Sequence, residues 1–161
     1  MPEARTEARP EARTELRRAT TSDLDAIYPR THALNEHEGI HLTAEGLRRS
    51  LGELLANPAL GGVWLVCERA GGATVGYAIV TYCFDLEFGG REGWLTELWI
   101  DDEARGRGAG SEVLAALDVL LRLEGVRALH LQVRADNPAL RLYERTGFTI
   151  TPRHVMTRRM A

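Results

Sequence analysis

The sequence has little cysteine, and the two cysteines that it contains are poorly placed for a disulfide. Cys67 and Cys83 fall in neighbouring strand-like segments joined by a turn at Gly71 and Gly72. A hairpin centred on that turn would place Cys67 opposite a position near Tyr77, and Cys83 would lie about 20 Å further along the strand. We therefore expect no disulfide, and nothing points to an oxidising compartment.

Positive charge and long apolar runs are also lacking. The 20 Lys and Arg are outnumbered by 23 Asp and Glu, which gives a net charge of -3 and a pI near 6.0. A nucleic-acid partner is not expected, because it requires a strongly basic domain or stripe. No apolar segment approaches the length of a membrane span, and the N-terminus lacks the apolar core of a signal peptide. We expect a cytoplasmic protein without membrane contact.

The 161 residues suit one domain preceded by a short tail. A hydrophobic content of 44% is sufficient for a substantial core. The sequence PEARTEAR at residues 2–9 is followed by PEARTELR at residues 10–17, a polar repeat with almost no apolar residue before Leu16. Such a segment cannot bury enough surface to offset its chain entropy. We expect residues 1–13 to be a disordered or frayed tail and residues 14–161 to form the domain.

Hydrophobic periodicity predicts a mixed α/β layer fold. A capping box at Ser22 and Asp25 predicts the start of the first helix, and Asn57 and Pro58 predict the end of the second. Asn137, followed by a proline, predicts the start of the last helix. The predicted order is a strand at 15–19, helices at 22–36 and 44–56, strands at 63–70, 75–84 and 94–100, a helix at 110–123, a strand at 129–133, a helix at 137–146 and a closing hairpin at 148–160.

A glycine-rich run between the predicted strand 94–100 and the helix after it is the most informative local feature. It reads Arg105, Gly106, Arg107, Gly108, Ala109, Gly110, Ser111. Glycines let the backbone turn tightly and approach a ligand, and the first N–H groups of a helix are unpaired and point toward the positive end of its dipole. This arrangement predicts a phosphate site. Alternatively, the glycines shape a structural turn, and Arg105 and Arg107 are solvated loop charges.

The spacing of the loop excludes two common nucleotide motifs. Gly106, Gly108 and Gly110 are separated by single residues, whereas the dinucleotide fingerprint requires two residues between its second and third glycines. A lysine before Ser111 would be needed for the phosphate loop of nucleotide hydrolases, and none is present. A different carrier of phosphate is therefore expected.

The segments on either side of the loop resemble the GNAT N-acetyltransferase superfamily. The first is LTELWIDDEARGRGAGSEVL at residues 95–114, in which Arg105, Gly108 and Gly110 match the acetyl-coenzyme A loop of that family. The second is VRADNPALRLYERTGF at residues 133–148, in which the family pattern of Asn, apolar residue and Tyr before Gly-Phe is matched by Asn137, Leu140, Tyr143, Gly147 and Phe148. The two motifs occur in the family's order and at a fitting separation.

The resemblance implies an α/β fold with a mostly antiparallel sheet of about seven strands, four helices, and splayed strands at the acyl-coenzyme A site. It implies that the backbone N–H groups of residues 105–111 bind pyrophosphate and that the pantetheine arm lies along the strand at Leu98, Trp99 and Ile100. Asn137 and Tyr143 complete the implied cofactor site. Acetyl-coenzyme A is the implied co-substrate, and no metal is expected.

Amine acetylation requires a base, an oxyanion donor and an acid for the departing thiolate. The resemblance implies that Tyr143 is the general acid, although a core tyrosine is the alternative. Glu97, beside the expected thioester position, is the first candidate for the general base; Glu92 or a water chain remains open. A backbone N–H near Leu98 is the candidate oxyanion donor.

The sequence His37, Glu38, Gly39, Ile40, His41 fits the two-histidine zinc-protease pattern. Zinc is not expected, because Gly39 weakens the continuous helix that the pattern needs and no third ligand follows. In the GNAT arrangement this segment borders the acceptor pocket, so Glu36, His37, Glu38 and His41 are candidates for acceptor binding, with exposed polar surface as the alternative.

We therefore expect an acetyltransferase that moves an acetyl group from acetyl-coenzyme A to a primary amine by direct transfer in a ternary complex. The acceptor would be a small-molecule or peptide amine. A non-catalytic acyl-coenzyme A-binding regulatory module is the alternative, and Tyr143 argues against it, since a binder does not need that hydroxyl. The resemblance is compatible with a homodimer, which the sequence does not establish.

Overall fold

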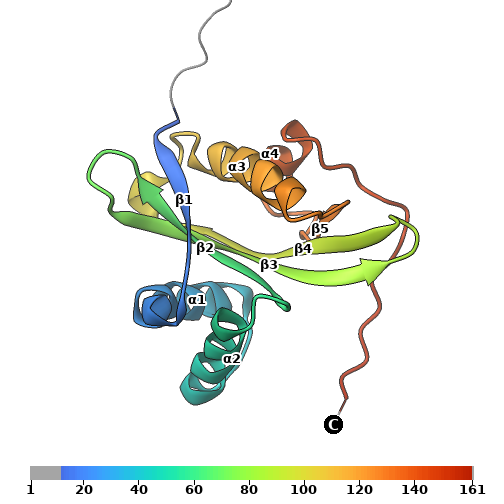
Figure 1. Ribbon diagram of the computed structural model, residues 1–161, viewed down its shortest axis with the longest axis horizontal. Helices are drawn as coiled ribbons and strands as arrows, with labels where there is room; N and C mark the ends of the chain where they lie inside the picture. The colour runs from blue at the N-terminus through green and yellow to red at the C-terminus, as the bar shows by residue number, and fades with distance from the viewer. Residues whose placement is uncertain (1–11, 161) are drawn as a thin grey trace, which may run out of the picture.

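A computed structural model describes residues 12–160, and its core is one sheet between two helical layers (Figure 1). The sheet order is β1-β2-β3-β4-β5, antiparallel throughout except for the parallel pair β4 and β5. The elements are β1 (Thr14–Arg18), α1 (Leu24–Glu38), α2 (Ala44–Ala56), β2 (Gly61–Glu68), β3 (Thr74–Asp85), β4 (Gly90–Ile100), α3 (Ala109–Leu123), β5 (Leu129–Leu131) and α4 (Leu140–Arg145), with short 3-10 turns at Thr21–Asp23 and Asp102–Ala104.

The helical layers explain why β2 is apolar at nearly every position. Trp64 and Val66 pack into the core shared with α3, whereas Val63, Leu65 and Cys67 pack into the core shared with α1 and α2. Alternate side chains of a strand point to opposite faces, so a strand covered on both sides reads as a continuous apolar run. Helix α3 contributes the matching apolar stripe on its side, and α1 and α2 cover the other face (Figure 1).

A bulge in β4 shapes the region of the predicted site. Leu95 lies opposite Val80 and Glu97 lies opposite Ile79, so Thr96 is the extra residue. Such a bulge bends its strand and increases the local twist. Strand β5 pairs with β4 only at Gly93–Leu95, and beyond this point β4 continues to Ile100 without a neighbour on that side in the described part of the chain. The two strands therefore diverge, as the family resemblance implied.

The fold class and the four helices are confirmed, but the expectation of about seven strands is wrong. The described residues form five strands, and the predicted closing hairpin at residues 148–160 is absent. Phe148 packs against the α3 core, after which residues 149–160 are all exposed and form no helix or strand. The segment includes Pro152, which lacks the N–H that a central strand would need.

Several boundaries differ from the predicted ones for local reasons. The cap before α1 lies at Thr20 and Asp23, where the Thr20 N–H donates to Asp23 Oδ2 at 2.8 Å, rather than at Ser22 and Asp25. Helix α1 continues to Glu38 and ends where Gly39 adopts a φ of 67°. Helix α4 begins at Leu140, because residues 137–139 form a turn in which Asn137 Oδ1 accepts the Ala139 N–H at 2.8 Å.

The hairpin register also corrects the predicted position of one cysteine. Cys67 lies opposite Thr74, whereas Tyr77 lies opposite Leu65, because the register shifts between Val66 and Cys67. Both cysteines are free, Cys67 buried and Cys83 exposed.

Most of the predicted tail lies outside the described residues. Within residues 12–160, Arg13 and Thr14 donate their backbone N–H groups to Glu112 Oε2 at 3.0 and 2.9 Å, so β1 is attached to α3 from its first residue. No helix in this range has both the length and the apolarity to cross a membrane.

Candidate functional site

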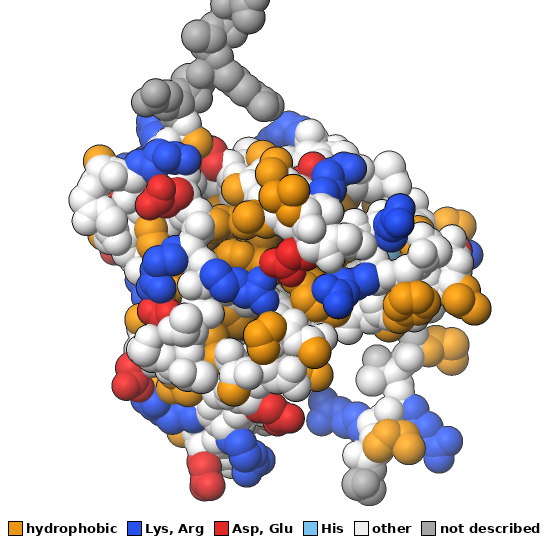
Figure 2. All heavy atoms as spheres, in the orientation of Figure 1, with side chains coloured by type: hydrophobic (Ala, Val, Ile, Leu, Met, Phe, Trp, Pro, Cys, Tyr) orange, Lys and Arg blue, Asp and Glu red, His pale blue; other side chains and the backbone are white. Residues whose placement is uncertain are grey.

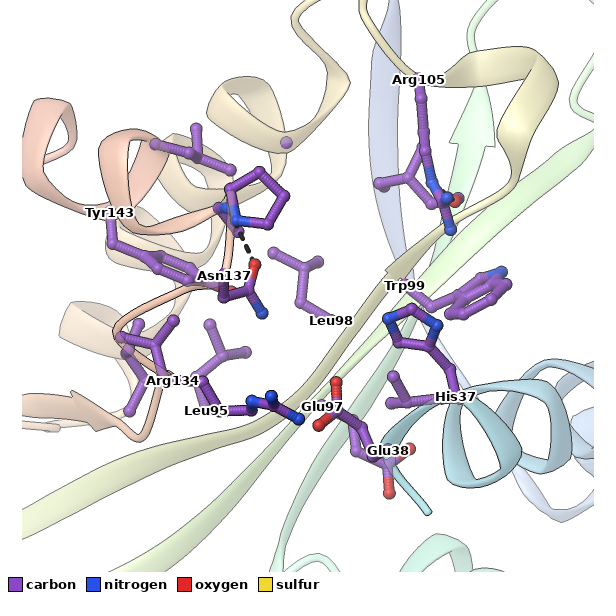
Figure 3. Close-up of a pocket in the computed structure, with 18 of the residues that line it drawn as sticks. His37, Glu38, Leu95, Glu97, Leu98, Trp99, Arg105, Arg134, Asn137 and Tyr143 are labelled. Carbon is purple, nitrogen blue, oxygen red and sulfur yellow. Dashed lines mark hydrogen bonds between the residues drawn. The ribbon is translucent and has the colours of Figure 1, made fainter. Parts of the chain in front are cut away.

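A cleft of about 1490 Å³ opens where β4 and β5 diverge (Figure 3). It exceeds the roughly 300–1,000 Å³ of ordinary small-molecule sites, so it has room for a long ligand and a second substrate. Its walls come from the second half of β4, the glycine loop, the segment that follows β5, the start of α4 and the end of α1. The predicted residues that line it are Glu97, Leu98, Trp99, Ile100, Arg105, Gly106, Gly108, Ala109, Gly110, Ser111, Asn137, Tyr143, His37 and Glu38.

The backbone of β4 presents to the cleft groups that strand β3 does not pair. Asp101 donates its N–H to the Val75 carbonyl at 2.8 Å, which fixes the hydrogen-bonding phase of the β3–β4 pair. In an antiparallel pair, positions bonded to the partner alternate with positions whose groups point away. Leu98 and Ile100 therefore direct their backbone groups away from β3 and into the cleft. This is the orientation that an extended ligand arm would need.

Trp99 has the opposite backbone orientation and a different role. Its backbone belongs to the ladder with Tyr77, so it is not free to bind a ligand. Its indole N–H donates to Asp101 Oδ1 at 3.0 Å, and its ring lies 4.8 Å from the Arg105 guanidinium carbon. Trp99 thus supports the side chain of the first loop residue.

Two glycines of the loop are required by backbone conformation and a third by packing. Gly106 and Gly108 have φ values of 73° and 89°, which side chains rarely tolerate, and a Cβ at either would meet nothing. Gly110 has an ordinary conformation, but a Cβ there would come within 2.8 Å of Leu142 Cδ2. The loop therefore combines a tight turn with close contact between α3 and α4.

The N-terminus of α3 opens into the same cleft. The first helical hydrogen bond runs from the Glu112 N–H to the Gly108 carbonyl at 3.1 Å. The N–H groups of Ala109, Gly110 and Ser111 have no partner among the described residues, and all three residues line the cleft. Unpaired N–H groups at the positive end of a 15-residue helix form a site for an anion.

The two loop arginines differ in position. Arg105 lines the cleft, where its Nε donates to the Ile100 carbonyl at 2.7 Å and its Nη1 lies 2.5 Å from Asp102 Oδ1. Arg105 therefore covers the Ile100 carbonyl, a group that the family resemblance assigns to the pantetheine arm. Arg107 is exposed and does not line the cleft.

Glu97 is half-buried at the cleft and is held by one neighbouring side chain. The Tyr77 hydroxyl donates to Glu97 Oε2 at 2.6 Å. Burial raises the pKa of Glu97, and the bond from Tyr77 only partly offsets this effect. Burial and the neighbouring Glu97 carboxylate raise the pKa of Tyr77 far above its ordinary value, so Tyr77 keeps its proton and holds one carboxylate oxygen. The other oxygen, Oε1, has no hydrogen-bond partner in the described part of the chain.

Tyr143 and Asn137 lie on the opposite wall of the cleft from β4 (Figure 3). Burial raises the pKa of Tyr143, and within residues 12–160 no hydrogen bond involves its hydroxyl. Its ring packs edge-on against Phe148 at 5.8 Å, which fixes its plane. Because the Asn137 amide oxygen holds the Ala139 N–H, its amide nitrogen is turned toward the cleft (Figure 3).

The predicted acceptor residues divide into two pairs. His37 and Glu38, at the end of α1, line the cleft on the side of Glu97 (Figure 3). Glu36 points elsewhere, 3.6 Å from His32, and His41 lies beyond the end of α1 and outside the lining. In residues 12–160, no three His, Cys, Asp or Glu side chains are placed to hold a metal ion.

Glu92, the rival candidate for the base, is not in the cleft. It is buried on the first half of β4, where its carboxylate accepts from Trp94 Nε1 at 3.2 Å and lies 3.0 Å from His130 Nε2. Of the two candidate carboxylates, only Glu97 lines the cleft.

Two residues that line the cleft, Arg134 and Asp136, and the buried Tyr77 behind Glu97 were not identified from the sequence. Tyr77 lies two residues from the partner of Glu97 in β3, so only the strand register, including the bulge, would have paired them. Arg134 and Asp136 lie in the second motif and form a bidentate ion pair, with Nε to Oδ1 at 3.1 Å and Nη2 to Oδ2 at 3.0 Å. Their place directly after a strand that borders the site was the available signal.

Comparison with known proteins agrees with this geometry. Residues 19–148 match the Acetyltransferase (GNAT) family. The chain is 40% identical over 62 residues to the uncharacterized N-acetyltransferase YycN of Bacillus subtilis (strain 168). That match spans 38% of this chain and about 40% of the length of YycN.

Solved structures share the whole fold. An integron cassette protein from the mobile metagenome of Cole Harbour Salt Marsh is 28% identical, with a TM-score of 0.79 over 91% of this chain and 90% of its own. A predicted acetyltransferase from Clostridium acetobutylicum, solved with acetyl-CoA, is 19% identical, with a TM-score of 0.74 over 90% of this chain and 96% of its own. The second likeness concerns the fold alone. With the family match spanning most of the domain and the two motifs meeting in one cleft, the chain belongs to the GNAT acetyltransferase family.

Proposed function

We propose that this protein transfers an acetyl group from acetyl-coenzyme A to a primary amine, directly and in a ternary complex. The observation that carries the proposal is the layout of the cleft. Unpaired N–H groups of α3 lie at one end, Glu97, held from behind by the buried Tyr77, lies at the other, and the free edge of β4 runs between them. A long ligand with phosphate at one end and a reactive thioester at the other fits this order.

The donor would bind along the free edge of β4. Its pyrophosphate would accept from the N–H groups of Ala109, Gly110 and Ser111, where the helix dipole favours negative charge. The amides of its pantetheine arm would pair with Leu98 and Ile100, as an added strand does. Arg105 would leave the Ile100 carbonyl in favour of a phosphate, since both contacts use the same guanidinium.

The chemistry would then proceed by direct attack. Glu97 accepts a proton from the ammonium group of the acceptor, directly or through water, and the free amine forms a C–N bond with the thioester carbon. The carbonyl oxygen gains negative charge that the Leu98 N–H stabilises. When the C–S bond breaks, Tyr143 donates its proton to the departing thiolate, and the second proton of the attacking nitrogen passes through water to the Tyr143 phenolate, which leaves a neutral amide. The products are an acetylated amine and coenzyme A.

The acceptor would enter from the end of α1. His37 and Glu38 border this side together with Arg134, whose guanidinium points toward the centre of the cleft (Figure 3). Glu38 and Glu97 favour a cationic amine at the mouth of the site.

The free cysteines also support our proposal that the protein works in the reducing cytoplasm.

A non-catalytic acyl-coenzyme A-binding module is the second candidate. It would use the same loop and β4 edge but would not need a half-buried carboxylate held by a tyrosine. The position of Glu97 on the cleft, its orientation by the Tyr77 hydroxyl at 2.6 Å and its raised pKa together support the enzyme instead, because a positioned carboxylate of raised pKa suits proton transfer.

Two experiments test the proposal. Thermal shift with acetyl-coenzyme A and with ATP tests the ligand: we expect stabilisation by acetyl-coenzyme A alone, and stabilisation by ATP alone would contradict the proposal. Thiol release from acetyl-coenzyme A, measured across antibiotics, polyamines, amino acids and peptide amines, tests the reaction. We expect thiol release only when one class of amine is present. Binding of acetyl-coenzyme A without thiol release in the presence of any of these amines would favour the non-catalytic module.

A further inference from the structure

The end of the cleft that borders α1 carries charges of both signs. Glu97 on β4 and Glu38 at the end of α1 lie on one side, and Arg134 reaches in from the segment that follows β5. In Figure 3 the Arg134 guanidinium extends from the opposite wall toward the space in front of Glu97. A ligand bound here therefore meets negative charge on one side and positive charge on the other.

The contact with Asp136 holds the Arg134 guanidinium in place but does not use all its donors. The pair joins Nε to Oδ1 at 3.1 Å and Nη2 to Oδ2 at 3.0 Å. A guanidinium has five N–H groups, so both on Nη1 and the second on Nη2 remain for another acceptor. One hydrogen from each of these two nitrogens forms a fork that matches the two oxygens of a carboxylate.

The acidic residues on the facing side do not occupy this fork. Within residues 12–160, Asp136 is the one carboxylate at ion-pair distance from Arg134. Asp136, and after it Glu38, raises the pKa of Arg134, so the Glu38 charge acts on the guanidinium without direct contact. Burial and the bond from Tyr77 set the pKa of Glu97, and Arg134 does not contribute. Arg134 is therefore not the counter-ion of the proposed base.

Charge selection of an acceptor has to come from the cleft itself. Over the described residues, Figure 2 shows basic and acidic side chains interspersed across the body of the molecule, and the net charge of the chain is only -3. A mixed surface of this kind does not steer ligands of one sign. Inside the cleft, an acceptor with several amines would bring a second cation toward Arg134, which like-charge repulsion disfavours.

From these contacts we infer that the acceptor is a free amino acid, whose carboxylate binds the open fork of Arg134 while its amine faces Glu97. The inference rests on the proposed acetyl transfer and names its substrate class. A peptide N-terminus does not meet both requirements, because the carboxyl next to its amine is an amide. In the reaction the C–N bond forms and the C–S bond breaks, one proton leaves through Glu97, and one ends on the thiol of coenzyme A. The amino acid carboxylate is unchanged in the product, an N-acetyl amino acid.

Pairs of matched acceptors test the inference. Each amino acid is compared with its own carboxamide, which keeps the side chain and the amine but lacks the carboxylate. The amine of the carboxamide loses its proton more readily, so intrinsic reactivity favours the carboxamide. For the amino acid that releases thiol fastest, we expect kcat/KM at least tenfold above that of its carboxamide. An equal or higher value for the carboxamide would overturn the inference and leave acetyl transfer itself intact.

Replacement of the anchoring charge tests the role of Arg134. Arg134→Gln should raise KM for the amino acid at least tenfold, with kcat/KM for the carboxamide and KM for acetyl-coenzyme A nearly unchanged. Arg141→Gln is the matched control, since it removes the same charge from an exposed position on α4 outside the cleft, and it should change none of these values. If Arg134→Gln instead raised KM for acetyl-coenzyme A alone, Arg134 would bind the donor and the inference would be wrong.

A binding measurement separates this inference from the proposed function. Thermal shift with amino acids in the presence of coenzyme A reports acceptor binding without turnover. If no amine released thiol, acetyl transfer would be refuted, but stabilisation by an amino acid that is lost in Arg134→Gln and kept in Arg141→Gln would still support the carboxylate site. Stabilisation by none of the standard amino acids, or equal stabilisation of the unaltered chain and Arg134→Gln, would overturn it.

Discussion

The Tyr77 hydroxyl donates a 2.6 Å hydrogen bond to Glu97 Oε2 across two neighbouring strands. This bond favours the charged carboxylate, whereas burial favours the neutral acid and raises the pKa of Glu97 overall. If Glu97 is the base, only its ionised form is active, so kcat/KM rises with pH through this raised pKa.

Tyr77→Phe should therefore shift the acidic limb of the pH profile to higher pH. The substitution removes the bond that holds the pKa of Glu97 down, so the loss of kcat/KM is largest at low pH and disappears above the new pKa. Glu97→Gln is the comparison: it should lower kcat by about 10²–10⁴-fold and abolish that limb. A Tyr77→Phe profile lowered equally at every pH would contradict this role of Glu97.

Tyr143→Phe should lower kcat by about 10²-fold or more and leave the Kd for coenzyme A nearly unchanged, because the hydroxyl acts only as the thiolate departs. Tyr28→Phe provides the control. Tyr28 lies on α1 beneath Arg48, 4.2 Å from its guanidinium carbon, and outside the cleft. If Tyr143→Phe had unchanged kcat, the Tyr143 hydroxyl would take no part in the reaction and the ring would serve only in packing.

Gly108→Ala should weaken coenzyme A binding and cost about 1–2 kcal/mol of stability, because Gly108 has a φ of 89°. The matched variant is Gly125→Ala, just beyond the other end of α3, where φ is 78° and a Cβ likewise meets nothing. Both variants should unfold earlier in denaturant, but only Gly108→Ala should lose affinity in calorimetry. If the two variants bound coenzyme A with equal affinity, the glycine loop would not be part of the phosphate-binding site.

Arg30→Lys should lower the free energy of unfolding by about 1 kcal/mol. Arg30 on α1 contacts both carboxylate oxygens of Asp101 and the Thr74 carbonyl, a geometry that lysine cannot reproduce. Arg122→Lys, in an exposed pair with Asp118 on α3, should change it by less than about 0.5 kcal/mol. If the two substitutions lowered the free energy of unfolding in urea equally, the contacts of Arg30 with Asp101 and Thr74 would add no more stability than an exposed ion pair.

The elements that form the cleft could be predicted from local patterns, because each element has a characteristic pattern of residues in the sequence. The apolar and β-branched residues along 94–100, the glycines at 106 and 108 and the periodic apolar face of α3 depend on backbone and packing rules that act over a few residues. Chain order then places the glycine loop at one wall of the cleft, since this loop lies between β4 and α3 in the sequence.

Long-range pairing set the limit of sequence prediction. The extra residue at Thr96 and the contact between Tyr77 and Glu97 depend on strand register, which no local pattern reveals. Residues 148–160 illustrate the same limit: the sequence predicts a closing hairpin there, but strand formation needs a neighbouring edge, and this segment forms no strand in the described part of the chain.

Direct acetyl transfer in this cleft can be tested by mass spectrometry of the reaction products. With acetyl-coenzyme A and an amine that supports thiol release, we predict acetylated amine and free coenzyme A in equal amounts and no acetyl group on the protein. Thiol release without acetylated amine, or an acetylated protein that passes its group to the amine, would contradict the account.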